Sequence, residues 1–294
     1  MTNNQLLEKM SQDMQMRNFS PYTYDFYLRK TKEMIKYFNK PLEKVTIEEL
    51  RNFLFIHLLQ ERKVADKTVN HYNSVIRFVY EVTLDKIINK KQLPMRKLKK
   101  AVYKVLTKQE LSTFFNSVDN FKFKTIFMLV YGTGLRIGEV VNLHISDIDS
   151  KTMRIFVREG KGNKERYTML PKASLEMLRT YWKDYRPKVE TDFMFLDECR
   201  KPINQYVIRT HFRKYRRKAE IDEKTTVHTL RHCYATNLIE NGASLIQVKE
   251  LMGHSNIRST MHYVHIANID LEIDSPLDVL LKGEENEKYT KNIK

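Results

Sequence analysis

Long apolar runs are missing from this 294-residue sequence, and none reaches the roughly 18 residues that a membrane-spanning helix needs. Cysteine is also scarce, since the chain has only Cys199 and Cys233. Two isolated cysteines favour free thiols in a reducing compartment, and their separation provides no zinc-binding pair. The N-terminal residues Met1–Asn4 are polar and lead directly into a helical pattern, so we expect no signal peptide. These absences favour a globular protein of the cytoplasm.

The charge balance is strongly positive, because 52 lysine and arginine residues face 36 aspartate and glutamate residues, a net charge of +16. Such a chain favours polyanionic partners, although a basic surface can also serve solubility alone. No acidic residue lies between Lys86 and Gln109, which predicts a basic linker over 89–105. It is either a solvated hinge or a hinge that lies along a phosphate backbone. In the second case we expect DNA contacts from Lys97, Lys99 and Lys100.

Residues 1–88 have the apolar periodicity of four helices. Ser20 followed by Pro21 is typical of a helix N-cap with proline at the first helical position. Thr46 and Glu49 have the spacing of a capping box, in which two side chains satisfy the first free N–H groups of a helix. We therefore predict an all-helical N-terminal domain over 1–88.

The pattern over 106–282 predicts a second, mixed domain, which begins with a capping box at Thr107 and Glu110 and ends in a C-terminal tail helix. An apolar helix over 125–130 ends at Gly132–Gly134, and alternating residues at 153–158 and 166–170 flank a turn sequence and predict a β-hairpin. Further helices are expected over 172–185, 204–218, 228–241, 245–252 and 256–264. The polar tail 283–294 is expected to be disordered. The expected fold class is mainly α (α+β), with one small antiparallel sheet.

This domain contains six polar side chains, each of which, taken alone, is better explained as an ordinary surface or core residue. They are Arg136, Lys161, His228, Arg231, His254 and Tyr263. Together they supply what covalent cleavage of a phosphodiester needs, which is a nucleophile, fixed positive charge, an acid and a base. A phenol with a pKa of roughly 10 needs cationic neighbours to attack at neutral pH.

The sequence contains no cluster of carboxylates of the kind that magnesium-dependent nucleases use, so we expect neither a metal nor another cofactor. The arginines and the lysine supply the positive charge at the phosphate instead. His228, His232 and Cys233 could suggest a zinc site, but a fourth ligand is missing.

Four motifs resemble the signature boxes of the tyrosine recombinases, which include phage integrases and Xer-type and transposon-borne recombinases. The motifs are Tyr131–Glu139, Gly160–Arg166, His228–His232 and Leu251–His254 followed by Tyr263. The resemblance implies site-specific DNA cleavage and rejoining through a 3′-phosphotyrosyl intermediate. It also implies that the N-terminal module is a SAM-like core-binding domain.

The resemblance implies a role for each motif residue. Arg136, His228 and Arg231 would bind and activate the scissile phosphate. Glu139 would support the site by holding Arg136 or a neighbouring cation. Lys161 would be the general acid for the 5′-hydroxyl, and His254 would be the second histidine of the site. Tyr263 would be the nucleophile.

The family's partners are double-stranded DNA with specific recombination sites and further copies of the protein. We therefore expect a homo-oligomer on DNA, a tetrameric synapse with C-terminal tail exchange, and a possible second recombinase. A prokaryotic, nucleoid-associated enzyme of the cytoplasm is implied. Three features differ from those of some relatives. Gly138 stands where many relatives have serine or threonine, and the short interval from Lys161 to His228 disfavours an integron integrase. No arm-binding domain is expected ahead of Asn4.

A densely basic helix precedes His228, and its alternative explanations are a solvated face or a DNA-contacting surface. For the second explanation the expected DNA contacts on this helix are Arg209, Arg213, Lys214, Arg216 and Arg217. Lys164 and Arg166, which belong to the expected hairpin, are also expected to contact DNA. Two other functions compete with recombination. One is a type IB topoisomerase-like or telomere-resolving enzyme, and the other is a catalytically inactive DNA-binding protein on the same scaffold.

Overall fold

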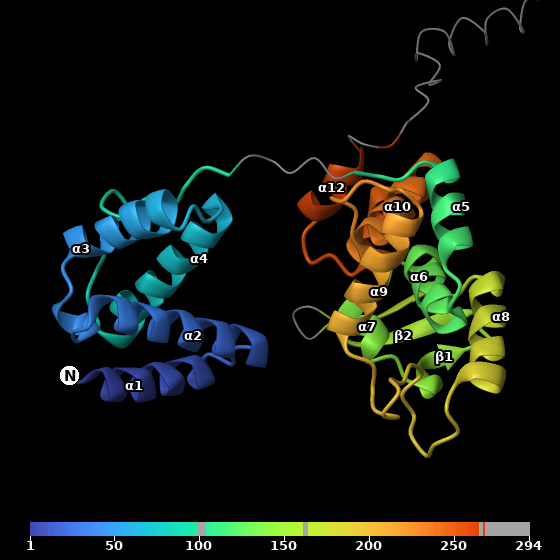
Figure 1. Cartoon of the computed structure of the whole chain (residues 1–294), viewed down its shortest axis with the longest axis horizontal. Helices are drawn as coiled ribbons and strands as arrows, with labels where there is room; N and C mark the ends of the chain where they lie inside the picture. The colour runs from blue at the N-terminus through green and yellow to red at the C-terminus, as the bar shows by residue number, and fades with distance from the viewer. Residues whose placement is uncertain (99–103, 161–163, 265–266, 268–294) are drawn as a thin grey trace, which may run out of the picture. The chain divides into compact units, whose positions relative to one another are not determined.

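Tertiary contacts divide the chain into two units, Met1–Ala101 and Val102–Lys294 (Figure 1). The computed structural model describes residues 1–98, 104–160, 164–264 and 267. The boundary between the units falls inside 89–105, where the sequence predicts a linker. The expected tail helix before 282 and the expected disorder of 283–294 lie outside the described residues. Within the described part, no helix is both long and apolar enough to cross a membrane.

The first unit is all-helical, as predicted, and two of its helices continue as π-helical turns. Its elements are α1 Asn3–Met16, α2 Pro21–Phe38, η1 Leu42–Lys44, α3 Ile47–Asn52 with η2 Phe53–Glu61, and α4 Asp66–Arg77 with η3 Phe78–Thr83. The predicted caps are present, because Ser20 accepts from the Thr23 amide and Thr46 forms a capping box with Glu49. One apolar core holds these helices together.

The start of the expected linker packs on the first unit. Leu93 is buried in the core of that unit. Its carbonyl accepts hydrogen bonds from Asn73 at 3.2 Å and from Arg77 at 2.8 Å. Arg96 and Asn70 exchange two further hydrogen bonds. The segment up to Arg96 is therefore anchored, which its basic composition did not reveal.

The second unit is mostly helical and contains one small sheet. The helices are α5 Lys108–Ser117, α6 Phe121–Thr133, α7 Ile137–Val141, η4 Ile145–Asp147, α8 Lys172–Thr180 with η5 Tyr181–Tyr185, α9 Gln205–Lys218, α10 Val227–Glu240, α11 Leu245–Met252 and α12 Arg258–Val264. The predicted capping box at Thr107 and Glu110 opens α5. Helix α10 packs against α6 and α12 (Figure 1) and also contacts α11.

The predicted hairpin is confirmed as β2 Arg154–Gly160 and β3 Lys164–Met169, paired antiparallel with Ile155 opposite Thr168. A short strand, β1 Ile148–Asp149, adds to the edge of β2, so that the sheet order is β1-β2-β3. The sequence did not indicate β1, because two residues are too few to show an alternating pattern. Strand β3 also contacts α11, which brings the sheet beside the helices of the site.

Candidate active site

A tight turn after α6 positions the first arginine of the site. Helix α6 ends at Thr133, and its C-cap residue Gly134 has a φ of 66°, in the left-handed region. A Cβ atom at this position would lie 2.4 Å from the Tyr234 ring, so glycine is required for both conformation and space. Leu135 is buried, and Arg136 then stands at the N-cap of α7. The Gly-Thr-Gly-Leu-Arg motif therefore fixes the position and direction of the Arg136 side chain.

Arg136 is held from two sides. Its backbone N–H donates to Glu139 Oε2 at 2.7 Å, and its Nη1 donates to Oε1 of the same carboxylate at 2.8 Å. Its Nη2 donates to the Gly253 carbonyl at 3.1 Å. The side chain stays partly accessible, so its guanidinium can meet a ligand without losing this support.

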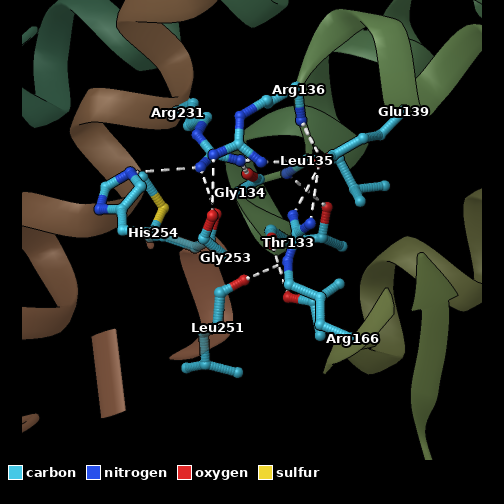
Figure 2. A network of polar contacts seen from close by, with 12 residues as sticks. Thr133, Gly134, Leu135, Arg136, Glu139, Arg166, Arg231, Leu251, Gly253 and His254 are labelled. Carbon is cyan, nitrogen blue, oxygen red and sulfur yellow. Dashed lines mark hydrogen bonds and ion pairs between the residues drawn. The ribbon is translucent and has the colours of Figure 1, made fainter. Parts of the chain in front are cut away.

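Glu139 is the centre of a buried charge cluster, with its side chain only 7% exposed (Figure 2). Arg166, from β3, donates two parallel hydrogen bonds of 2.8 Å to the carboxylate. Arg231 Nη1 lies 3.8 Å from Oε2. Burial alone would raise the pKa of Glu139, but the hydrogen bonds and charges of Arg166 and Arg136 outweigh it and lower the pKa to about 2. We call Arg136, Arg166 and Arg231 around Glu139 the arginine network.

Arg231 is the most deeply placed member, with its side chain 1% exposed. It donates to the Gly134 carbonyl and, at 2.5 Å, to the Met252 carbonyl. Burial, and then the charge of Arg136, lower the pKa of Arg231 to about 9, which still leaves the guanidinium charged at neutral pH. Two fixed carbonyls therefore aim a permanent positive charge into the site.

Two histidines stand beside these arginines. Burial and then the charges of Arg231 and Arg136 lower the pKa of both His228 and His254 to about 4, although His228 keeps an open face towards solvent. His254 Nε2 lies 3.4 Å from Arg231 Nη2 and its Nδ1 lies 2.9 Å from Thr260 Oγ1. A guanidinium N–H can only donate, so Nδ1 of His254 carries the proton.

Tyr263 lies on α12 and is 3% exposed. Its ring packs in a small apolar cluster that includes Tyr234, Val248 and Met252. The ring planes of Tyr263 and His254 are nearly parallel, with centroids 6.2 Å apart. The Tyr263 hydroxyl lies 3.0 Å from Nδ1 of His232.

One cavity of about 340 Å³ brings these groups together. It is lined by Arg136, His228, Arg231, His232, His254 and Tyr263, among others. Five of the six residues expected to be catalytic therefore face one space, and the sixth, Lys161, lies outside the described residues. In the described ranges, no group of three or more histidine, cysteine, aspartate or glutamate side chains could hold a metal ion.

The expected DNA contacts divide into two kinds. Helix α9 exposes a row of cations that we call the α9 basic face, composed of Arg209, Arg213, Lys214 and Arg217. Arg216 on the same helix is buried, and its guanidinium donates to the carbonyls of Glu223 and Thr225. Arg166 is likewise committed to Glu139 and to the Leu251 carbonyl, at 3.0 Å. Arg166 and Arg216 are structural residues here, and we remove them from the expected DNA contacts.

The remaining expected contacts lie around the linker and the hairpin. Lys97 is exposed, whereas Lys99 and Lys100 lie outside the described residues. Lys164 pairs in β3 opposite Gly160, and the placement of its side chain is not among the described features. Sequence analysis assigned no catalytic role to His232, although its position four residues after His228 places both histidines on one face of α10.

Comparisons with known proteins agree with this geometry. Residues 104–268 match the profile of the phage integrase family, and residues 6–90 match that of the phage integrase N-terminal SAM-like domain. A protein described as the integrase/recombinase y4qK of Sinorhizobium fredii is 34% identical over 278 residues, which cover 94% of this chain and 89% of that protein. Tyrosine recombinase XerC of Anoxybacillus flavithermus is 29% identical over 269 residues, 85% of this chain and 89% of that protein.

Two solved structures show the same fold. The XerH site-specific recombinase bound to palindromic difH substrate has a TM-score of 0.71 at 20% identity, covering 87% of this chain and 80% of that one. A lambda integrase dimer bound to a COC′ core site has a TM-score of 0.72 at 18% identity, covering 90% of this chain and 95% of that one. The match extends over both units of this chain.

Proposed function

The chain belongs to the phage integrase family, a family of DNA strand-breaking and rejoining enzymes, and we propose that Tyr263 is the residue that carries the cut strand. The chain is a tyrosine-type site-specific recombinase. The assignment of the nucleophile rests on one observation, the cavity in which Tyr263 faces Arg136, Arg231, His228 and His254. A phenol beside two fixed guanidiniums suits attack on a phosphodiester.

Arg136 and Arg231 bind the two non-bridging oxygens of the scissile phosphate. Both are permanently charged, and both are held in place before DNA arrives, Arg136 by Glu139 and Arg231 by backbone carbonyls. Charge that is fixed in advance stabilises the extra negative charge of the transition state without reorganisation. Guanidinium groups suit this role better than the lysine ammonium group, because they are planar, permanently charged and able to donate two parallel hydrogen bonds.

The Tyr263 oxygen then forms a bond to phosphorus as the bond from phosphorus to the 5′ oxygen breaks. Lys161 gives the departing 5′ oxygen its proton, and the phenolic proton passes to a base that faces the cavity. His228 suits this role, because its ring is exposed and faces the cavity that also contains Tyr263. Attack by a 5′-hydroxyl of a second duplex reverses the step, so neither ATP nor a metal is required.

The enzyme acts as an oligomer on DNA. Recombination joins two duplexes, and each cut needs its own Tyr263, so the assembly we propose is a tetrameric synapse. The lambda integrase dimer bound to a COC′ core site supports a multimer on DNA. We further propose that subunits exchange their C-terminal tails and that a second recombinase takes part. The proposed place of action is the nucleoid in the cytoplasm.

A nicked suicide duplex tests this function. The duplex carries a sequence recovered by crosslinking the protein to DNA in its own cells, and the cut strand loses the short 5′-hydroxyl fragment that would reverse cleavage. We expect the wild type and Tyr185→Phe, an exposed-tyrosine control, to form a covalent adduct. Tyr263→Phe should bind the duplex but form none.

Three outcomes would contradict parts of this account. An adduct with Tyr263→Phe would remove Tyr263 as the nucleophile. Binding without any adduct from the wild type would favour a DNA-binding protein on this scaffold. Relaxation of one supercoiled plasmid, without exchange between two sites, would favour the topoisomerase-like alternative.

A further inference from the structure

Helix α10 carries a second histidine at the site, to which the proposed reaction assigns no role. His232 follows His228 by one helical turn, and the two rings meet edge to face with centroids 4.7 Å apart. Its side chain is buried, and the ring centroids of His232 and Tyr263 lie 5.5 Å apart. The Nδ1 atom of His232 and the Tyr263 hydroxyl are at hydrogen-bond distance, 3.0 Å.

The packing around Tyr263 leaves its hydroxyl to be directed by polar groups. Helix α12 has seven residues, and the tyrosine ring is held by the apolar cluster with Tyr234, Val248 and Met252. Such packing fixes the plane of the ring. It does not select the direction of the O–H bond, which depends on a hydrogen-bond partner. His232 reaches this hydroxyl from α10, the helix that also carries His228 and Arg231.

We propose that His232 is a positioning residue, whose buried ring holds the Tyr263 hydroxyl in the catalytic cavity by the hydrogen bond at Nδ1. The inference rests on the proposed role of Tyr263 as the nucleophile. In this arrangement α10 aligns both reaction partners, because Arg231 binds the phosphate and His232 orients the oxygen that attacks it. A displacement of the attacking atom by about 1 Å can cost about a hundredfold in rate, so the hydrogen bond affects cleavage directly.

The electrostatic surroundings favour positioning over proton transfer. The titratable or charged groups that line the cavity are Arg136 at the start of α7, His228 and Arg231 on α10, His254 after α11, and His262 on α12. Burial, and then the charges of His228, Arg231 and His254, lower the pKa of His232 to about 3. A ring with this pKa stays neutral at physiological pH, and it is buried, whereas the ring of His228 is exposed and can pass a proton on to solvent.

Two substitutions separate the hydrogen bond from the volume of the ring. His232→Phe keeps an aromatic ring but removes Nδ1, and His232→Asn keeps a polar group near the position of Nδ1. His71→Asn changes an exposed histidine of the first unit and serves as the control. Single-turnover adduct formation is measured on the suicide duplex with enzyme in excess, and DNA affinity is measured separately. Circular dichroism confirms that each variant is folded at the assay temperature.

We expect His232→Phe to form the adduct about ten- to a hundredfold more slowly at unchanged DNA affinity, because the hydroxyl loses its alignment. His232→Asn should recover the rate to within about threefold of the wild type. The rate of His232→Asn should depend on pH as that of the wild type does, because His232 does not titrate between about pH 5 and pH 8.

Two results would overturn the inference and leave the proposed function intact. One is a wild-type cleavage rate for folded His232→Phe. The other is a His232→Asn variant as slow as His232→Phe whose pH profile has lost a wild-type limb, which would make His232 a proton acceptor. A wild type that forms no Tyr263-dependent adduct would instead refute the proposed function.

Discussion

The arginine network and the α9 basic face are two groups of cations in the second unit with similar chemistry and opposite surroundings. Those of the arginine network are held by Glu139 and by backbone carbonyls, and Arg166 and Arg231 are almost fully buried. Those of the α9 basic face are exposed. A buried charge requires fixed partners, whereas an exposed charge is solvated and exchanges partners freely. The first group therefore builds a site of fixed geometry, and the second suits sequence-independent attraction of DNA.

The largest effect is expected from removal of the negative charge at the centre of the network. Glu139→Gln leaves Arg136, Arg166 and Arg231 without their common anion, and breaking a buried ion pair costs about 3–5 kcal/mol in the free energy of unfolding. The two guanidiniums that we propose to bind the phosphate also lose alignment, so adduct formation should slow by about a hundredfold or more. Chemical denaturation and the suicide duplex measure the two effects.

Glu176→Gln is the matched control, since Glu176 is an exposed glutamate on α8. It should change neither stability nor cleavage. Equal stability of Glu139→Gln and Glu176→Gln would show that the network does not require its anion, and the contrast between the two groups of cations would then fail.

A smaller effect is expected from Arg166→Lys, which keeps the charge but loses the two parallel hydrogen bonds to Glu139. The Arg166 side chain also fills the space beside Gly253, where a Cβ atom would lie 2.8 Å from it. We expect a loss of about 2 kcal/mol in the free energy of unfolding, because lysine cannot reproduce bidentate geometry. DNA affinity at high salt should be unaffected. A change in the salt dependence of binding would restore Arg166 to the DNA contacts.

The neighbouring residues Arg216 and Arg217 allow a structural role and a DNA-contacting role to be compared within one helix. Arg216→Ala removes buried hydrogen bonds to Glu223 and Thr225 and should cost about 2 kcal/mol of stability. Arg217→Ala should leave stability within about 0.5 kcal/mol of the wild type. It should, however, reduce the slope of log affinity against log salt by about 0.9, the value for one phosphate contact. Reversed effects would mean that burial does not separate the two roles.

The smallest expected effect is a change in the pH dependence of the free energy of unfolding, which appears only below neutral pH. The pKa of His232 is about 3 in the folded protein and 6.5 as its ordinary value. Between these values the unfolded chain binds a proton that the folded chain does not, so the free energy of unfolding falls as pH falls. His232→Asn should reduce this pH dependence by up to one proton, about 1.4 kcal/mol per pH unit. Parallel denaturation series at pH 7 and pH 5 measure it, and identical slopes would contradict the burial of an uncharged ring.

Much of the fold could be predicted from the sequence, because its signals are local. The caps at Ser20, Thr46 and Thr107 start helices where expected, and the alternating segments before and after 161–163 form the hairpin. The family motifs placed Arg136 and Tyr263 in one site before any geometry was known. These features depend on residues that are close together in the sequence or on a known pattern.

The remaining features depend on contacts between distant segments. Arg166 and Arg216 look like other basic residues of the sequence, and only the positions of Glu139 and of the Glu223 and Thr225 carbonyls make them structural. His232 looks like a core histidine until α12 brings Tyr263 to it. The burial of Leu93 likewise depends on α4, about twenty residues away. Charge and periodicity carry no information on such partners.

The central claim is that Tyr263 forms the covalent bond to DNA, and a map of the trapped adduct tests it most directly. The wild-type adduct on the suicide duplex is digested with nuclease and protease, and the nucleotide-bearing peptide is sequenced by mass spectrometry. We predict that the nucleotide is attached to Tyr263 through a 3′-phosphate. Attachment to any other residue, or through a 5′-phosphate, would contradict the account.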